Sequence, residues 1–275
     1  MSDIVLLLQW SGGGVLNIFL SSPSFCFNTL TENAREFSKY FDNWEIVSEH
    51  KNDILEHKEE LKEVMGSFQM GFRVHAPFSD LNTASVNRAV REFGQQRIIE
   101  NIRVCNEVGI DVITVHPGWR NPVTRFDPGV VPELNRGFAL RLSKAQEEYG
   151  VKVGLENMPY GSKLDCASLE DYMFVTRETE VGLTLDIGHA FIEDALDDFI
   201  SIKERIVNVH VHDNGGDKDE HLVLGKGDCD FKEVFSKLLP IDNPYYKDCL
   251  VIESNSFPDA ILSQGFLRGL LAELV

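Results

Sequence analysis

Histidines and carboxylates in this sequence gather at the ends of short apolar segments. The chain has eight histidines. Six of them, with four carboxylates, end or closely follow such segments: His75, His116, Glu156, Asp186, His189, His210, His212, Asp219, His221 and Glu253. Imidazole and carboxylate donors together suit zinc, manganese or iron. One such histidine alone is more often an ordinary core residue, but ten donors at comparable positions predict a metal site.

The carboxylates strengthen this prediction. Like-charged groups crowded at one place repel one another and take up protons unless a cation lies between them. A divalent metal removes that conflict. We therefore expect bound divalent metal ions, with zinc as the first choice and manganese or iron as alternatives.

The elements that position these residues alternate between strands and helices, which is typical of parallel strands joined by crossover helices. We expect strands near 15–27, 44–49, 72–78, 112–118, 151–158, 181–189, 206–213 and 249–256. We expect helices near 31–41, 52–65, 84–108, 131–149, 168–178, 193–203, 230–239 and 258–274. Eight such pairs predict a (β/α)8 TIM barrel, with residues 1–275 as one domain. An open doubly wound sheet is the alternative, but no GxGxxG motif follows a strand.

Side-chain alternation along the strands points the donors inward. In VNVHVHD, the three valines share one face, and Asn208, His210 and His212 share the other. Glu156 follows Gly154 on one face in the same way, and His116 follows Thr114. Active sites of such barrels lie at the carboxyl ends of the strands. The donors are therefore expected to meet there.

Composition limits the partners and the compartment. The net charge of −18 opposes binding to nucleic acid, because such binding depends on basic contacts to phosphates. The five cysteines form no CxxC pair, which favours reduced thiols and a cytoplasmic location. No apolar run approaches the length that spans a membrane. We interpret the apolar start, 1–10, as a buried segment or a strand under the barrel rather than a signal peptide.

Several motifs resemble the xylose-isomerase-like TIM barrel superfamily, which includes sugar (phosphate) isomerases and epimerases and endonuclease IV. They are HAPFSDLN (75–82), VHPG (115–118), LENM (155–158), LDIGHA (185–190), HVHDN (210–214), DEHLVLGKGDCDF (219–231) and IES (252–254). The resemblance runs from about residue 20 to the end. It supports the fold but separates the activities poorly.

The resemblance implies two ligand sets. A four-ligand site like that of the epimerases would use Glu156, Asp186, Glu253 and either His210 or His212. A three-zinc site like that of endonuclease IV would use His75, His116, Glu156, Asp186, His189, His210, Asp219, His221 and Glu253. His212 is a less secure ligand than His210, because Asn or Asp often occupies that second inward position and orients the metal ligands by hydrogen bonds.

Two activities follow from these sets. In an isomerase or epimerase of a sugar or sugar phosphate, Glu156 and Glu253 would move a proton beside a carbonyl that the metal polarises. His212 and Lys226 would orient hydroxyls or a phosphate, and Trp119 and Phe78 would form an apolar wall. In an endonuclease IV-like phosphoesterase, activated water would attack phosphorus. A metal-stabilised binding protein without turnover is a third class.

We expect the isomerase or epimerase, because the surface is acidic, the first strand region SSPSFCFNTL lacks the histidine-bearing turn of endonuclease IV, and no Arg-rich DNA-binding loop follows it. Metal content discriminates the two: about one ion per chain favours the isomerase and about three favour the phosphoesterase. We also expect the Gly- and Asp-rich loop 213–230 to be a flap that metal orders through Asp219 and His221.

Overall fold

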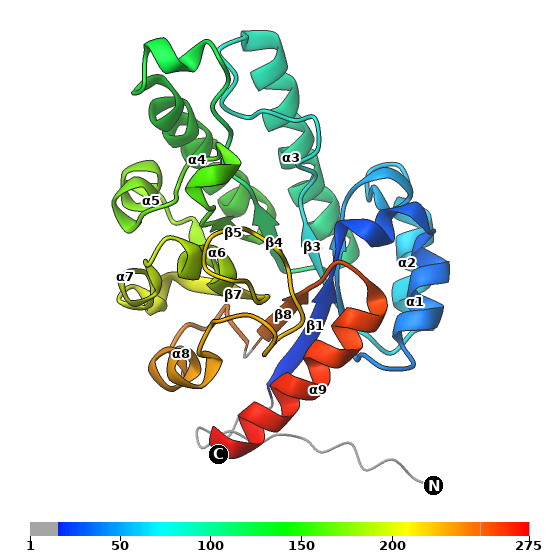
Figure 1. The fold of residues 1–275 in the computed structure, drawn as a ribbon. Coiled ribbons are helices and arrows are strands. Elements are labelled where there is room, and N and C mark those ends of the chain that lie inside the picture. Colours follow the sequence, from blue (N-terminus) through cyan, green and yellow to red (C-terminus); the bar gives the residue numbers. More distant parts are fainter. Residues whose placement is uncertain (1–15, 248, 275) are drawn as a thin grey trace, which may run out of the picture.

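A computed structural model of the chain describes residues 16–247 and 249–274. Within them, eight parallel strands pair in chain order and close into a barrel, and helices follow the strands, as Figure 1 shows. The strands are β1 (Asn17–Ser21), β2 (Asn43–Val47), β3 (Gly71–His75), β4 (Val112–Val115), β5 (Lys152–Glu156), β6 (Gly182–Asp186), β7 (Ile206–Val211) and β8 (Cys249–Glu253). The predicted (β/α)8 TIM barrel is confirmed. That residues 1–275 form one domain stays a prediction.

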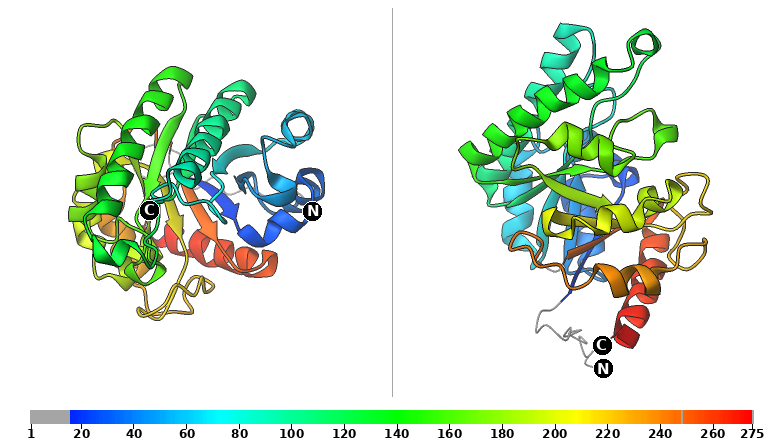
Figure 2. Two further views of the ribbon diagram at one scale, coloured as in Figure 1. Left: turned by 90° about the horizontal axis from the view of Figure 1, so that it is seen from above. Right: turned by 90° about the vertical axis from the view of Figure 1, so that its left-hand side faces the viewer.

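The helices form a ring outside the strands (Figure 2). They are α1 (Leu30–Phe37), α2 (Lys58–Ser67), α3 (Arg88–Val108), α4 (Val130–Tyr149), α5 (Leu169–Thr176), α6 (Ile187–Ile192), α7 (Leu196–Ile200), α8 (Phe231–Leu238) and α9 (Phe257–Leu274). Short 3-10 helices are η1 (Pro23–Phe27), η2 (His50–Asn52), η3 (Thr124–Phe126), η4 (Tyr160–Ser162) and η5 (Lys203–Arg205). Outward aliphatic side chains of the strands, such as Val209 and Val211, belong to the buried core.

Several predicted elements are wrong in their limits. The strand predicted over 181–189 ends at Asp186, because the carboxylate of Asp186 accepts the His189 backbone N–H at 2.7 Å and caps α6. His189 therefore lies in the first turn of a helix. The helix predicted over 193–203 is confirmed only over α7 (Leu196–Ile200), and η5 begins at Lys203. The first predicted strand is confirmed only over β1, and the apolar segment 1–10 lies outside the described residues.

The barrel interior below the strand ends is polar. Asn208 on β7 donates to Glu45 at 2.6 Å and to Thr114 at 3.0 Å, and it accepts from Arg73 at 2.5 Å. Thr114 and Thr184 share a further hydrogen bond of 3.0 Å. All five side chains are buried, so their mutual hydrogen bonds offset the cost of removing them from water. This network, called here the polar floor, lies in the barrel interior beneath the donor residues.

All five cysteines are free thiols and are buried, as expected for reduced cysteines. Among the described residues, no helix is both long and apolar enough to cross a bilayer. The cytoplasmic location stays a prediction.

Candidate metal centre

The first set of donors, named here the His75 group, consists of His75, His116 and Glu156. They stand at the ends of β3, β4 and β5. His116 Nε2 lies 3.0 Å from Glu156 Oε2, and His75 Nε2 lies 3.4 Å from the same oxygen. His75 Nδ1 is 2.9 Å from the Ala76 carbonyl, which fixes the ring so that Nε2 faces Glu156. The group offers three ligand atoms.

The second set, the Glu253 group, consists of Glu156, Asp186, His210 and Glu253. The parallel register sets Asp186 of β6 beside His210 of β7, after a shift between Leu183 and Thr184. His210 Nδ1 lies 3.2 Å from Glu253 and 3.4 Å from Glu156. Glu156 thus belongs to both groups, as a carboxylate that bridges two metal ions would.

The third set, the loop group, consists of His189, His212, Asp219 and His221. His189 comes from α6, His212 directly follows β7, and the other two lie on the loop after it. Asp219 is central: its carboxylate oxygens lie 3.1 Å from His221 Nε2, 3.4 Å from His189 Nε2 and 3.5 Å from His212 Nε2. In each group, the ligand atoms all lie within 4.8 Å of one another.

All nine residues of the predicted three-metal set therefore come together. The geometry places His210 in the Glu253 group and His212 in the loop group, and which of the two binds metal stays a prediction. Lys226 joins none of the groups and is exposed. Trp119 lies beside the His75 group, in the pocket described below.

The charges in this region call for cations. Five carboxylates line the interior and its mouth: Glu45, Glu156, Asp186, Asp219 and Glu253. Burial by itself lowers the pKa of His189, but Asp186, Asp219 and Glu156 outweigh it and raise the pKa to about 10. Burial likewise raises the pKa of Glu156, but His116 and His210 hold it well below its usual range. The carboxylates thus draw positive charge to the site, as protons or as metal ions.

Polar atoms without partners mark the same place. Among the described residues, buried side-chain atoms that lack a hydrogen-bond partner include Glu156 Oε2, Asp186 Oδ2, His189 Nε2, His210 Nδ1 and both ring nitrogens of His212. Buried polar groups are normally satisfied, so several orphan atoms in one cluster indicate a missing partner. Burial also lowers the pKa of His116, which leaves a neutral imidazole, the form that binds a metal. The residues fit divalent metal ions.

The family model described as xylose isomerase-like TIM barrel matches residues 34–269. The chain belongs to this family. An uncharacterized family relative from Methanocaldococcus jannaschii is 33% identical over 265 residues, covering 90% of this chain and 87% of that protein. A probable endonuclease 4 from Aquifex aeolicus is 31% identical over 196 residues, covering 62% of this chain and 67% of that protein.

Solved structures show the same family likeness over nearly the whole length. The crystal structure of a D-tagatose 3-epimerase-like protein matches with a TM-score of 0.85 and 30% identity, covering 94% of this chain and 98% of that one. The relatives thus carry both epimerase and endonuclease names. The likeness establishes the family, and the two names belong to the relatives.

Two supporting residues of this xylose isomerase-like barrel escape the sequence analysis. Glu45 Oε1 lies 2.9 Å from His210 Nε2, so it orients the ring from behind. Asn157 accepts the Asp186 N–H at 2.8 Å and donates to the Asp186 carbonyl at 3.0 Å, while its own carbonyl lies 2.9 Å from His189 Nδ1. An acidic residue inside the apolar strand NWEIV was the one signal for Glu45.

Asp213 organises the base of the loop after β7. Its carboxylate accepts the N–H groups of Gly225 at 2.8 Å, Gly227 at 2.9 Å and Cys229 at 3.3 Å. Its backbone also exchanges two hydrogen bonds with Leu222. The base of the flap predicted over 213–230 is therefore held by protein groups. Ordering by metal stays a prediction, and the geometry restricts it to the outer part near Asp219.

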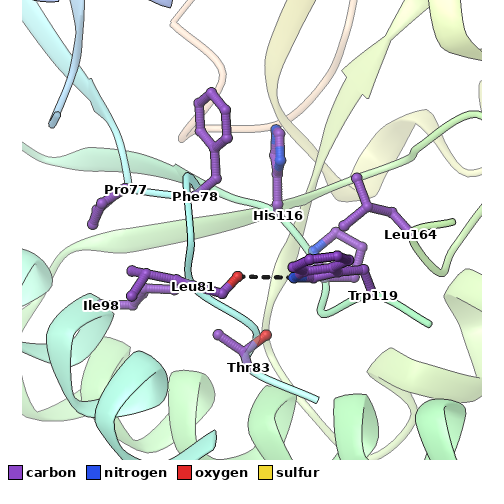
Figure 3. Close-up of a pocket in the computed structure, with 9 residues that line it drawn as sticks. Pro77, Phe78, Leu81, Thr83, Ile98, His116, Trp119 and Leu164 are labelled. Carbon is purple, nitrogen blue, oxygen red and sulfur yellow. Dashed lines mark hydrogen bonds between the residues drawn. The ribbon is translucent and has the colours of Figure 1, made fainter. Parts of the chain in front are cut away.

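An apolar pocket of about 140 Å³ adjoins the His75 group, and His116 lines both (Figure 3). The Phe78 ring stacks on His116 with centroids 4.8 Å apart. The Trp119 indole donates to the Leu81 carbonyl at 3.0 Å, and its backbone is tied to Asn82 in both directions. Phe78 and Trp119 thus form an apolar wall next to the donors, on the loops after β3 and β4.

Proposed function

We propose that this protein is a divalent-metal-dependent phosphoesterase that uses three metal ions, zinc being the first candidate. The observation that carries the proposal is the number of donor groups, because proton transfer by an isomerase needs only the Glu253 group. The His75 group and the loop group add six further donor residues. Among these, His189 Nε2 and both ring nitrogens of His212 are buried and form no hydrogen bond within the described residues. The identity to a probable endonuclease 4 supports the same chemistry. This reverses the preference that composition and the first strand region suggested.

The chain's own residues would have distinct tasks. Bound metal ions would neutralise a phosphate ester and lower the pKa of water. Glu253 has the most accessible carboxylate of its group, with 12% of its side chain exposed against 1% for Glu156 and 0% for Asp186. Its Oε2 atom would accept the proton of the attacking water. Phe78 and Trp119 would hold an apolar or aromatic part of the ester.

The charge argues for a small ester rather than a duplex. With a net charge of −18, long-range attraction of a polyanion is absent, so nucleic acid is the less favoured substrate. Hydrolysis of abasic-site DNA is therefore a separate arm of the test and is expected to be weak at about 150 mM salt.

A metal-dependent sugar epimerase is the second candidate. It is favoured by the carboxylates of Glu156 and Glu253, which both lie near His210 Nδ1, and by the likeness to the D-tagatose 3-epimerase-like protein. In that reaction the two carboxylates would remove and return a proton on a carbon beside a carbonyl. Histidines of the other groups would then orient hydroxyls.

The two functions give different results with protein purified without chelator. Phosphoesterase chemistry predicts about three metals per chain and chelator-sensitive hydrolysis of bis(p-nitrophenyl) phosphate, whose aromatic groups suit the pocket. Ketohexoses in heavy water provide the opposing assay. About one metal per chain, no hydrolysis, and deuterium uptake beside the carbonyl would overturn the proposal in favour of the epimerase.

A further inference from the structure

The loop group differs from the His75 group in how many donors it offers. The His75 group supplies three ligand atoms and the loop group four, of which three are imidazoles. Zinc takes four ligands in structural sites, whereas catalytic zinc keeps one position for water or substrate. A three-donor group thus leaves a position open. The Glu253 group has four donors but shares Glu156 with the His75 group, so these two groups together offer six residues for two ions. The loop group shares no residue, and its four donors leave no position open on its own ion.

His212 supplies the additional donor, and the barrel makes room for it. The ring is fully buried, and neither nitrogen has a hydrogen-bond partner among the described residues, although Nε2 lies 3.1 Å from Asp186 Oδ1. A Cβ atom at position 188 would come within 2.2 Å of the ring, so only glycine fits there. Asn214 bonds the Gly188 carbonyl at 3.0 Å and keeps the two segments together. A buried imidazole that lies beside two carboxylates but forms no hydrogen bond with them indicates a metal ligand.

The outer part of the loop after β7 depends on the contacts of the loop group more than the base of that loop does. Positions 215 and 217–220 are exposed, so this stretch has little core of its own. His221 also adopts φ 49°, a conformation that is unfavourable for residues other than glycine. Asn255 supports the loop only through the carbonyls of Glu220 and His221, at 2.9 and 3.3 Å. Ligation by Asp219 and His221 would offset the entropy lost on ordering this stretch.

We propose that the loop group is a closed four-ligand metal site that fastens the loop after β7 to α6 and the end of β7, and that its ion does not contact the substrate. This rests on the metal dependence in the proposed function but not on phosphoester hydrolysis. It divides the centre into one structural position and a reactive part formed by the His75 and Glu253 groups.

The test compares His212→Asn with His116→Asn, a matched change in the His75 group. Each protein is loaded with zinc and dialysed against a weak chelator, and its zinc content and amide hydrogen exchange are measured. His212→Asn should lose about one zinc per chain, and exchange at 215–221 should rise about tenfold or more. The amides of Gly225, Gly227 and Cys229 should stay protected by Asp213. His116→Asn should lose zinc without loosening the loop.

Full zinc content and unchanged protection in folded His212→Asn would overturn the proposal. If that variant does not fold, chelator-treated wild-type protein is used, and equal exchange at 215–221 with and without zinc has the same meaning. Cobalt-loaded wild type provides the second readout. Inorganic phosphate should perturb the visible spectrum of open positions, and that response should persist in His212→Asn and fall in His116→Asn. Absent phosphoester hydrolysis with these results intact would refute the proposed function alone.

Discussion

The sharing of Glu156 by two donor groups predicts an unusually large effect of a small change. In Glu156→Gln, the volume is kept but the charge that faces His75, His116 and His210 is lost. Because Glu156 is a member of both the His75 and Glu253 groups, both metals should be lost or strongly weakened. Glu253→Gln, which affects one group, is the matched control. Both variants should abolish catalysis while the barrel stays folded.

The magnitude follows from linkage. A metal at a free concentration one hundred times its Kd stabilises the fold by about 2.7 kcal/mol, so losing two metals removes about 5 kcal/mol of zinc-induced stabilisation and losing one removes about half of that. Urea unfolding with and without zinc measures the difference, and elemental analysis counts the ions. The reasoning would be refuted if Glu156→Gln lost only as much zinc and stability as Glu253→Gln.

Three further changes test the surroundings of the centre. Glu45→Gln removes the carboxylate behind His210 and should weaken metal binding about 10- to 100-fold, as measured by chelator competition; unchanged affinity would contradict this role. Asp213→Ala removes the acceptor of three loop N–H groups, that of the buried Cys229 among them, and should lower the free energy of unfolding by about 1–3 kcal/mol in saturating zinc. A change below about 0.5 kcal/mol would count against this role of Asp213. Trp119→Ala should raise KM for an aryl phosphodiester about tenfold, roughly 1.4 kcal/mol, with metal content unchanged; a fall in kcat at constant KM would exclude a binding role.

Much of the centre was predictable because strand periodicity is a local property. Alternation in VNVHVHD places Asn208, His210 and His212 on one face, and the contacts of all three inside the barrel confirm it. Alternation cannot assign His210 and His212 to different metals. That depends on the register shift in β6 and on the space at Gly188, which arise only when the strands pair.

Capping and long-range contacts account for the remaining errors. His189 looks like a strand residue because LDIGHA is apolar, but the Asp186 carboxylate starts a helix at that point. Glu45 is more than 160 residues from its partner Asn208 in the chain, so no local pattern connects them. Asp213 resembles any acidic residue of a polar loop until the amides that it binds are seen.

The polar floor beneath the donors has a consequence for how this barrel can change over generations. Arg73, Asn208, Glu45 and Thr114 come from four different strands and satisfy one another, so replacing one of them leaves a buried partner stranded. Substitutions at these four positions are therefore expected to occur together rather than one at a time. Substitutions that change the substrate are expected in the loops after β3 and β4 instead, because their exposed side chains do not belong to this hydrogen-bond network. Single substitutions are therefore expected to be tolerated in these loops and to be destabilising in the buried network.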